Sequence, residues 1–245
     1  MRIAIVSDVH SNLEGLQAVL GRAEAGGAVD AVWCLGDIVG YGPEPSEVVS
    51  ELRKRRLTVV AGNHDLAACG RMGVEEFNRA AAGAVLWTRD QLSYAEADFL
   101  RGLPLTVIAG SFTLVHGSLR YPEWEYLLSG EQALAQFELQ TTPYSLVGHS
   151  HLPFWVEEED PGRTPLFHRA EDGATLALGE RRLIINPGSC GQPRDGDPRA
   201  SFVLYDDGAA TVTWHRVEYD IEETQHKMRR AGLDTWLTER LAIGQ

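Results

Sequence analysis

Five short polar clusters, each placed directly after an apolar run, constrain this chain more than any other feature of its sequence. Short apolar runs that contain branched residues are typical of buried strands. Open α/β sheets bind ligands at the carboxyl ends of their strands, so we expect the clusters to meet at one edge. The clusters are Asp8-Val9-His10, Gly36-Asp37, Gly62-Asn63-His64-Asp65, His116-Gly117 and Gly148-His149-Ser150-His151.

The second cluster is the pivot of this set. It follows the apolar run 31–35, which Gly36 ends. The Asp37 carboxylate would have two oxygens free to point out of the sheet, so it could contact two cations at once. A Gly-Asp pair alone is a common turn former, and a single Asp-x-His pair is more often a turn or a helix cap. Five such clusters in one chain favour a shared metal site over five separate turns.

The donor types in the clusters indicate the class of metal. Neutral imidazole suits borderline metals, and carboxylate and amide oxygens suit hard ones, so the mixture favours Mn, Fe, Co, Ni or Zn over Ca. Two cations bridged by one carboxylate would lie about 3.5–4 Å apart, close enough to clamp the attacking and leaving oxygens of one phosphate. These donors are compatible with a pair of divalent metal ions as cofactors, with Mn²⁺ first and Fe, Co, Ni or Zn as alternatives.

The composition of the chain limits the classes of partner that it can bind. The formal charge of −13 and the pI of about 5.0 argue against binding to long nucleic acid, which needs a basic surface. A small phosphorylated substrate stays compatible, because bound cations reverse the local charge. No apolar run approaches the roughly 20 residues that span a bilayer, and the first run is too short for a signal peptide. We expect a cytoplasmic protein without membrane partners, and the sequence makes no prediction of its oligomeric state.

The order of expected elements changes along the chain. Strands and helices alternate up to about residue 61, whereas later strands follow one another directly. This pattern predicts an α/β (α+β) fold, a four-layer αββα sandwich of two mixed sheets flanked by helices. We expect a single domain over residues 1–245 with a helical tail at about 221–241. The expected helices cover 13–23, 46–55, 75–101, 130–137 and the tail, which is broken near Gly232, and the expected strands cover 3–6, 31–35, 58–61, 104–109, 112–115, 144–147, 175–178, 182–185, 201–205 and 210–216.

Taken in order, the five clusters resemble the signature of the calcineurin-like metallophosphoesterase family. The resemblance spans residues 8–151, and the β-rich remainder with Asn186-Pro187-Gly188-Ser189 is similar to the compact bacterial and archaeal phosphodiesterase branch. It implies an αββα sandwich with a binuclear metal centre. It also implies the ligands: Asp8, His10 and His151 for one metal, Asn63, His116 and His149 for the second, and Asp37 as the bridge.

The resemblance further implies a catalytic role for His64. This residue would not be a ligand but would face the phosphate and the leaving group, where an acid typically contributes ~10²–10⁴-fold. The nucleophile would be metal-bound hydroxide, attacking phosphorus in line. Two roles are possible for Asp65: it either caps the following helix or orients His64.

Residues outside the clusters carry weaker expectations. Tyr41, between two glycines, could line the substrate pocket and stack on a nucleobase. Arg194 suits phosphate contact, although a surface salt bridge is the alternative. Asn186 and Ser189 are expected to shape a turn near the site and not to bind metal.

The expected function is that of a binuclear-metal phosphohydrolase, a phosphodiesterase on nucleotide-like or other small phosphodiesters. One alternative is a phosphomonoesterase or protein phosphatase of the same fold. Another is a non-catalytic interaction module. A module of that kind should have lost His64 or several ligands, whereas this chain keeps all of them.

Overall fold

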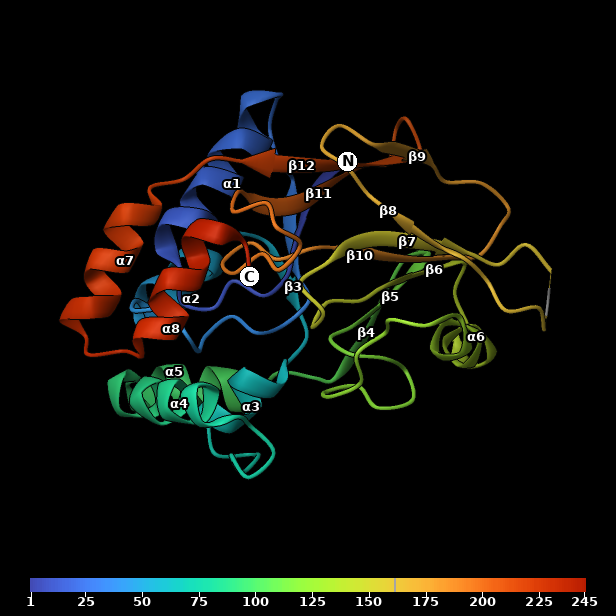
Figure 1. Cartoon of the computed structure of the whole chain (residues 1–245). Helices are drawn as coiled ribbons and strands as arrows, with labels where there is room; N and C mark the ends of the chain where they lie inside the picture. The colour runs from blue at the N-terminus through green and yellow to red at the C-terminus, as the bar shows by residue number, and fades with distance from the viewer. Residues whose placement is uncertain (161) are drawn as a thin grey trace.

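Two six-stranded sheets lie face to face in the computed structural model, which describes residues 1–160 and 162–245 (Figure 1). Both sheets combine parallel and antiparallel pairs, as predicted. The first sheet has the order β3 (Leu57–Val59), β2 (Ala31–Cys34), β1 (Arg2–Val6), β11 (Ala200–Asp206), β12 (Thr211–Val217), β9 (Thr175–Ala177). The second sheet has the order β4 (Thr106–Ala109), β5 (Phe112–Val115), β6 (Tyr144–Leu146), β10 (Leu183–Pro187), β7 (Pro153–Glu157), β8 (Phe167–Arg169).

Helices cover the outer faces of both sheets and complete the four-layer αββα sandwich, which confirms the predicted fold class. Helix α6 packs on the second sheet through Ala133 and Phe137, and α1 packs on the first through Leu16 and Val19. The helices are α1 (Leu13–Ala25), α2 (Pro45–Arg53), α3 (Asn63–Ala68), α4 (Arg79–Gln91), α5 (Tyr94–Arg101), α6 (Gly130–Leu139), α7 (Ile221–Arg230) and α8 (Thr235–Glu239), followed by the 3-10 helix η1 (Arg240–Ile243).

Strand β1 shows why its sequence is apolar without alternation. Ile3 and Ile5 face the second sheet, while Ala4 and Val6 face the helices. A strand that is covered on both faces reads as a continuous apolar run. β1 pairs in parallel with β2 and antiparallel with β11, so it joins the amino-terminal unit to the carboxyl-terminal strands.

The helix predicted over residues 75–101 is two helices. α4 ends at Gln91 and α5 begins at Tyr94. Ser93 separates them, because its hydroxyl accepts a hydrogen bond from the Glu96 amide while the Glu96 carboxylate accepts one from the Ser93 amide. This reciprocal capping box starts a new helix.

The carboxyl-terminal helices form a layer over α1 and α4. Gly232, in the left-handed region with a φ of 72°, ends α7 close to the predicted break. Met228 and Leu241 pack in one cluster with Tyr41 and with Ala81 of α4. The tail therefore contacts the loop that follows the pivot strand.

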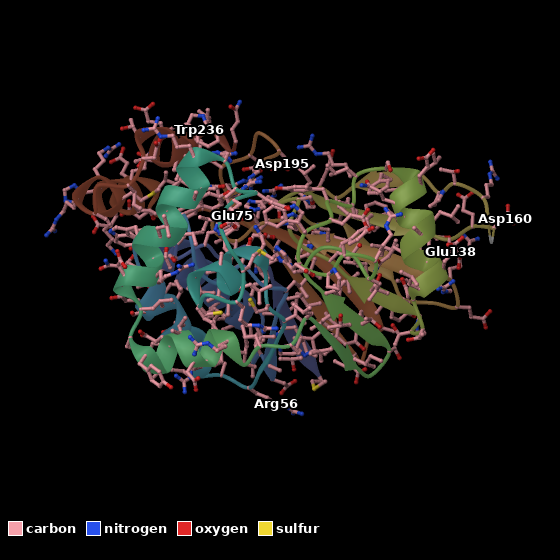
Figure 2. The ribbon with its side chains drawn as sticks, turned by 90° about the horizontal axis from the view of Figure 1, so that it is seen from below. Arg56, Glu75, Glu138, Asp160, Asp195 and Trp236 are labelled. Atoms are coloured by element: carbon pink, nitrogen blue, oxygen red, sulfur yellow. The ribbon has the colours of Figure 1, made fainter. Side chains whose placement is uncertain are left out.

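The five polar clusters follow β1, β2, β3, β5 and β6, at one edge of the sandwich. In Figure 2, Arg56, just before β3, lies at the bottom of the view, and Asp195 and Trp236 lie towards the top. Among the described residues, none of the helices has the length and apolar character needed to cross a membrane.

Candidate metal centre

The structure brings the predicted ligands together in two groups. Donor atoms of Asp8, His10 and His151 lie within 4.8 Å of one another, and all three residues are buried. Donor atoms of Asp37, His116 and His149 form a second group within the same distance. The Asn63 side chain joins this second group, because its Oδ1 lies 3.2 Å from His116 Nε2.

Asp37 lies between the two groups. Its Oδ2 is 3.6 Å from His10 Nε2 and 3.4 Å from His116 Nε2. Its Oδ1 accepts a hydrogen bond from the main-chain N–H of His64 at 2.9 Å. One carboxylate oxygen therefore faces both groups, while the other oxygen fixes the start of α3.

The protonation of the first group fits a cation. The Nδ1 atoms of His10 and His151 face the carbonyl oxygens of Val39 and Gln192 at 3.2 Å and 2.5 Å. Burial lowers the pKa of both imidazoles well below the usual value, so each ring is neutral and has one N–H, which a carbonyl oxygen accepts. The two Nε2 atoms then carry lone pairs that face each other at 3.1 Å. Such an arrangement is repulsive unless a cation lies between the donors.

Asp8 is the third member of the first group, and its carboxylate accepts no hydrogen bond from the described part of the protein. Neither oxygen of its carboxylate has a hydrogen-bond partner, and Oδ1 lies 3.3 Å from His151 Nε2. Burial raises the Asp8 pKa to about 7, because desolvation outweighs the charge of His116. A divalent cation would supply the missing counter-charge, so the residues present fit a metal site.

The second group differs from the first in that one of its imidazoles is protonated. Burial lowers the pKa of His116, but the Asp37 carboxylate more than reverses this and raises it to about 9. Burial in turn opposes the ionisation of Asp37, yet the charged imidazole of His116 holds the Asp37 pKa well below the usual range. His116 Nε2 also lies 3.1 Å from His149 Nδ1. Cation binding here would replace a proton on His116.

Strained backbone gathers in the loops of this centre. Within the described residues, eight that are not glycine have positive φ, and only Ala210 lies elsewhere, in the β11–β12 turn. Such conformations cost about 1–3 kcal/mol each and persist where the surroundings over-determine them. The seven in the site loops are Asp8 (φ 53°), His10 (49°), Ser11 (53°), Asp37 (51°), Tyr41 (56°), His149 (63°) and His151 (60°).

Two glycines leave room for the functional side chains. A Cβ at Gly62 would lie 2.1 Å from Asp37 Oδ1, and a Cβ at Gly40 would lie 2.3 Å from His64 Nδ1. No larger residue fits either position without displacing the neighbouring side chain.

His64 is buried beside the two groups and lines a cavity of about 360 Å³. Its ring centroid lies 4.8 Å from that of His10 and 5.0 Å from that of Phe77. Burial lowers its pKa to about 4, so the imidazole is neutral. Asp65 makes the contacts of a helix cap: its oxygens accept from the main-chain N–H groups of Gly62 and Val39, each at 3.1 Å.

Arg194 and Tyr41 both line the cavity. Arg194 donates a hydrogen bond to Gln192 Oε1 at 2.9 Å, and its Cζ lies 5.8 Å from the Tyr41 ring centroid. None of the ion pairs within residues 1–160 and 162–245 includes Arg194. Tyr41 is only 7% exposed, with its ring 4.6 Å from His10 and 4.3 Å from His64, which leaves little of it open for stacking.

The turn around residues 186–189 holds the loops of the centre and adds no donor to either group. Asn186 donates from Nδ2 to the Gly148 carbonyl oxygen at 2.9 Å, and Ser189 donates from its hydroxyl to the Asp8 carbonyl oxygen at 2.8 Å. These contacts agree with the expectation that both residues shape the turn.

Part of the cavity was not predicted. Phe77 lies in the helix expected over 75–101, and Trp124 and Tyr126 lie in no expected element. The available signal was the aromatic-rich stretch 121–126, which follows the His116 cluster within ten residues. The cavity is lined by Asp37, Tyr41, Asn63, His64, Glu76, Phe77, Asn78, Ala81, Trp124, Tyr126, His149, His151 and Arg194.

Comparisons with known proteins agree on one family. The sequence model of the calcineurin-like phosphoesterase superfamily domain matches residues 1–208. A metallophosphoesterase from Sphaerobacter thermophilus has a crystal structure that covers 100% of this chain and 99% of its own, with a TM-score of 0.91 and 46% identity. An uncharacterised protein of Methanocaldococcus jannaschii is 38% identical over 99% of this chain and 98% of its own length.

A more distant similarity concerns enzymes with a stated activity. The symmetrical bis(5'-nucleosyl)-tetraphosphatase of Vibrio cholerae is 31% identical over 140 residues. The match includes 55% of this chain and 50% of the relative. This chain therefore spans about half the length of that relative.

Proposed function

The chain belongs to the calcineurin-like phosphoesterase superfamily and is a metal-dependent phosphoesterase, and from this premise we propose that it is a phosphodiesterase with a binuclear centre. Its substrates would be nucleotide-like or other small phosphodiesters. The observation that carries this proposal is the position of Asp37, whose Oδ2 faces both donor groups.

We assign the ligands from that geometry. Asp8, His10 and His151 would hold one metal, Asn63, His116 and His149 the other, and Asp37 would bridge them. Mn²⁺ is the first choice of metal. When bound, two such cations neutralise phosphate charge and make hydroxide available near neutral pH.

His64 would act on the leaving oxygen. The hydrogen bond from its main-chain N–H to Asp37 Oδ1 fixes the residue relative to the bridging carboxylate. Its ring faces the cavity as a neutral imidazole, which donates one hydrogen bond, and an anionic phosphate beside it would raise the imidazole pKa. Proton donation to the departing alcohol would follow from that rise.

Arg194 and Tyr41, which lie next to each other in the cavity lining, would bind substrate. Because Arg194 Nε is buried without a hydrogen-bond partner, this guanidinium keeps donors for a phosphate oxygen. Tyr41 would hold the Arg194 side chain in place.

A second candidate is hydrolysis of dinucleoside tetraphosphates. It is favoured by the similarity to the symmetrical tetraphosphatases. A phosphomonoesterase or protein phosphatase activity is the remaining alternative on this fold.

The test is a hydrolysis assay with Mn²⁺, using bis(4-nitrophenyl) phosphate and the matching monoester, 4-nitrophenyl phosphate. We expect faster hydrolysis of the diester, and a loss of about 10²–10⁴-fold in kcat for His64→Ala. His168→Ala, at an exposed histidine stacked on Trp155, is the matched control. Faster hydrolysis of the monoester would overturn the diesterase assignment. Inactivity of the wild type and of His64→Ala with every divalent cation would favour an interaction module.

We also propose that residues 1–245 fold as a single domain with its helical tail at about 221–241. Thr224 donates to Glu14 Oε2 at 2.9 Å, and Lys227 lies 2.8 Å from Glu44 Oε1. These contacts tie α7 to the elements that follow β1 and β2.

A further inference from the structure

Three aromatic side chains form one wall of the cavity beside His64, and we call Phe77, Trp124 and Tyr126 the aromatic wall. Phe77 precedes α4, and the other two lie in the loop that follows β5. The Phe77 and Trp124 rings are 5.2 Å apart at 66°, and the Phe77 ring is 5.0 Å from His64. The wall therefore begins at the residue assigned to the leaving oxygen.

Core packing accounts for one ring of this wall, because Phe77 packs against the cluster that contains Tyr41, but not for the other two. Tyr126 is 43% exposed, whereas core aromatic residues such as Trp214 are about 1% exposed. Neither Trp124 nor Tyr126 belongs to a hydrophobic core cluster of the described residues. Aromatic faces that are open to a cavity are typical of ligand sites.

The polar groups at the wall limit the charge of what binds there. Glu76 and Asn78 flank Phe77 in the sequence and line the same cavity. A carboxylate in this position repels a further phosphate group but accepts hydrogen bonds from hydroxyl or amino groups. Arg194, the cationic residue of the cavity, lies against Tyr41 instead.

We propose that the aromatic wall is the subsite for a flat, uncharged leaving group, so that the preferred substrates are phosphodiesters of a nucleoside. The leaving nucleoside would stack its base on Trp124 and Phe77, with Glu76 accepting from its polar edge. This inference rests on the proposed function, which places His64 at the leaving oxygen.

The kinetic test compares a diester that contains nucleosides with a diester that has no flat group. Thymidylyl-(3′→5′)-thymidine releases a nucleoside, and sn-glycero-3-phosphoethanolamine releases a small aliphatic alcohol whichever ester bond breaks. Because stacking on one aromatic ring accounts for about tenfold in binding, Trp124→Leu should raise KM for the first substrate about tenfold and leave KM for the second unchanged.

The substitution keeps the hydrogen-bond contact between Trp124 and His149, because this contact uses the main-chain carbonyl oxygen of Trp124, 3.1 Å from His149 Nε2. The Trp124 ring, which the substitution removes, lies 6.1 Å from the His149 ring. Trp124→Phe, which keeps a flat ring, should restore most of the affinity. Trp236→Leu, at an exposed residue of α8 outside the cavity lining, is the matched control.

A binding measurement covers the case in which Trp124→Leu does not fold. Thymidine added to the Mn²⁺-loaded protein should quench tryptophan fluorescence in the wild type and in Trp236→Leu. The quenching should disappear in Trp124→Phe, while thymidine still inhibits that variant competitively.

The outcomes separate the two proposals. If the wild type hydrolyses neither diester, the proposed function is wrong. If it hydrolyses both and Trp124→Leu changes their KM values equally or not at all, the proposed function stands and the subsite is wrong. Unchanged quenching in Trp124→Phe would also overturn the subsite.

Discussion

The two sides of the cavity are built in different ways. The donor side consists of side chains at strand ends, held by left-handed backbone and by glycines that admit no Cβ. The aromatic wall consists of rings from two loops, and its open surface reaches 43% at Tyr126. The comparison teaches that the donor side is over-determined by main-chain geometry, whereas the wall depends on the choice of side chain. Substitutions on the donor side should therefore affect stability and metal binding, and substitutions of Trp124 should affect substrate preference. Tyr126 belongs to both sides, because its ring stacks on that of His149 at 3.9 Å.

The largest expected effect comes from Asp37→Asn. This change removes the negative charge that faces both donor groups. Hydrolysis should fall to the level measured without protein. Mn²⁺ at 100 times its Kd, which should stabilise the wild type by about 2.7 kcal/mol, should stabilise this variant much less. Thermal unfolding with and without Mn²⁺ measures the difference, and Trp124→Leu should keep the full stabilisation. If Mn²⁺ stabilises Asp37→Asn against thermal unfolding as much as it stabilises the wild type, the donor side does not bind metal as described.

The next largest effect is expected for Gly62→Ala. The added Cβ would lie 2.1 Å from Asp37 Oδ1, so the carboxylate or the start of α3 must move. Overpacking of this kind costs about 1–3 kcal/mol. Denaturant unfolding should show that loss together with weaker Mn²⁺ binding. Unchanged stability would mean that the donor side is softer than its geometry indicates.

Asp65→Ala tests the cap at the start of α3. The variant loses both acceptors, and the main-chain N–H groups of Gly62 and Val39 lose their partners. Loss of a helix cap costs about 0.5–2 kcal/mol. Denaturant unfolding should show this loss, with kcat reduced far less than in His64→Ala. An equal reduction of kcat would instead support the alternative in which Asp65 orients His64.

The smallest effect is expected for Gly83→Ala, in the helix that follows Phe77. Gly83 is an exposed residue of α4, and a Cβ there would have nothing within 4 Å. Replacing glycine with alanine inside a helix stabilises it by about 0.5–1 kcal/mol. The free energy of unfolding should rise by that amount with activity unchanged. A decrease would show that this side is also tightly constrained.

The donor side could be predicted because its signal is local in the sequence. Each cluster directly follows its own apolar strand, and parallel strands bring their carboxyl ends to one edge, so Asp8 and Asp37 are expected to be neighbours without a view of the fold. The alternation of elements likewise indicated two mixed sheets. The chemistry of the donors predicted which kind of atom would face the shared space.

The aromatic wall could not be predicted in the same way. Phe77 and Trp124 meet across two loops that share no pattern, and the helix expected over 75–101 included Phe77, which the structure places before α4. The division between α4 and α5 was missed although Ser93 and Glu96 have the spacing of a capping box. For Asp65, both alternatives used the same residue at the same position, and only its hydrogen bonds separated them.

The pairing of β1 with β11 has a consequence for biosynthesis. The loop that holds Asp8 and His10 is closed by bonds from Ser189 and Gly191, and its strand finds its antiparallel neighbour only at residues 203–206. A ribosome therefore releases the first two donors long before their surroundings exist. The full set of donors exists only after His151 has emerged, so we expect metal loading to be a late step of maturation.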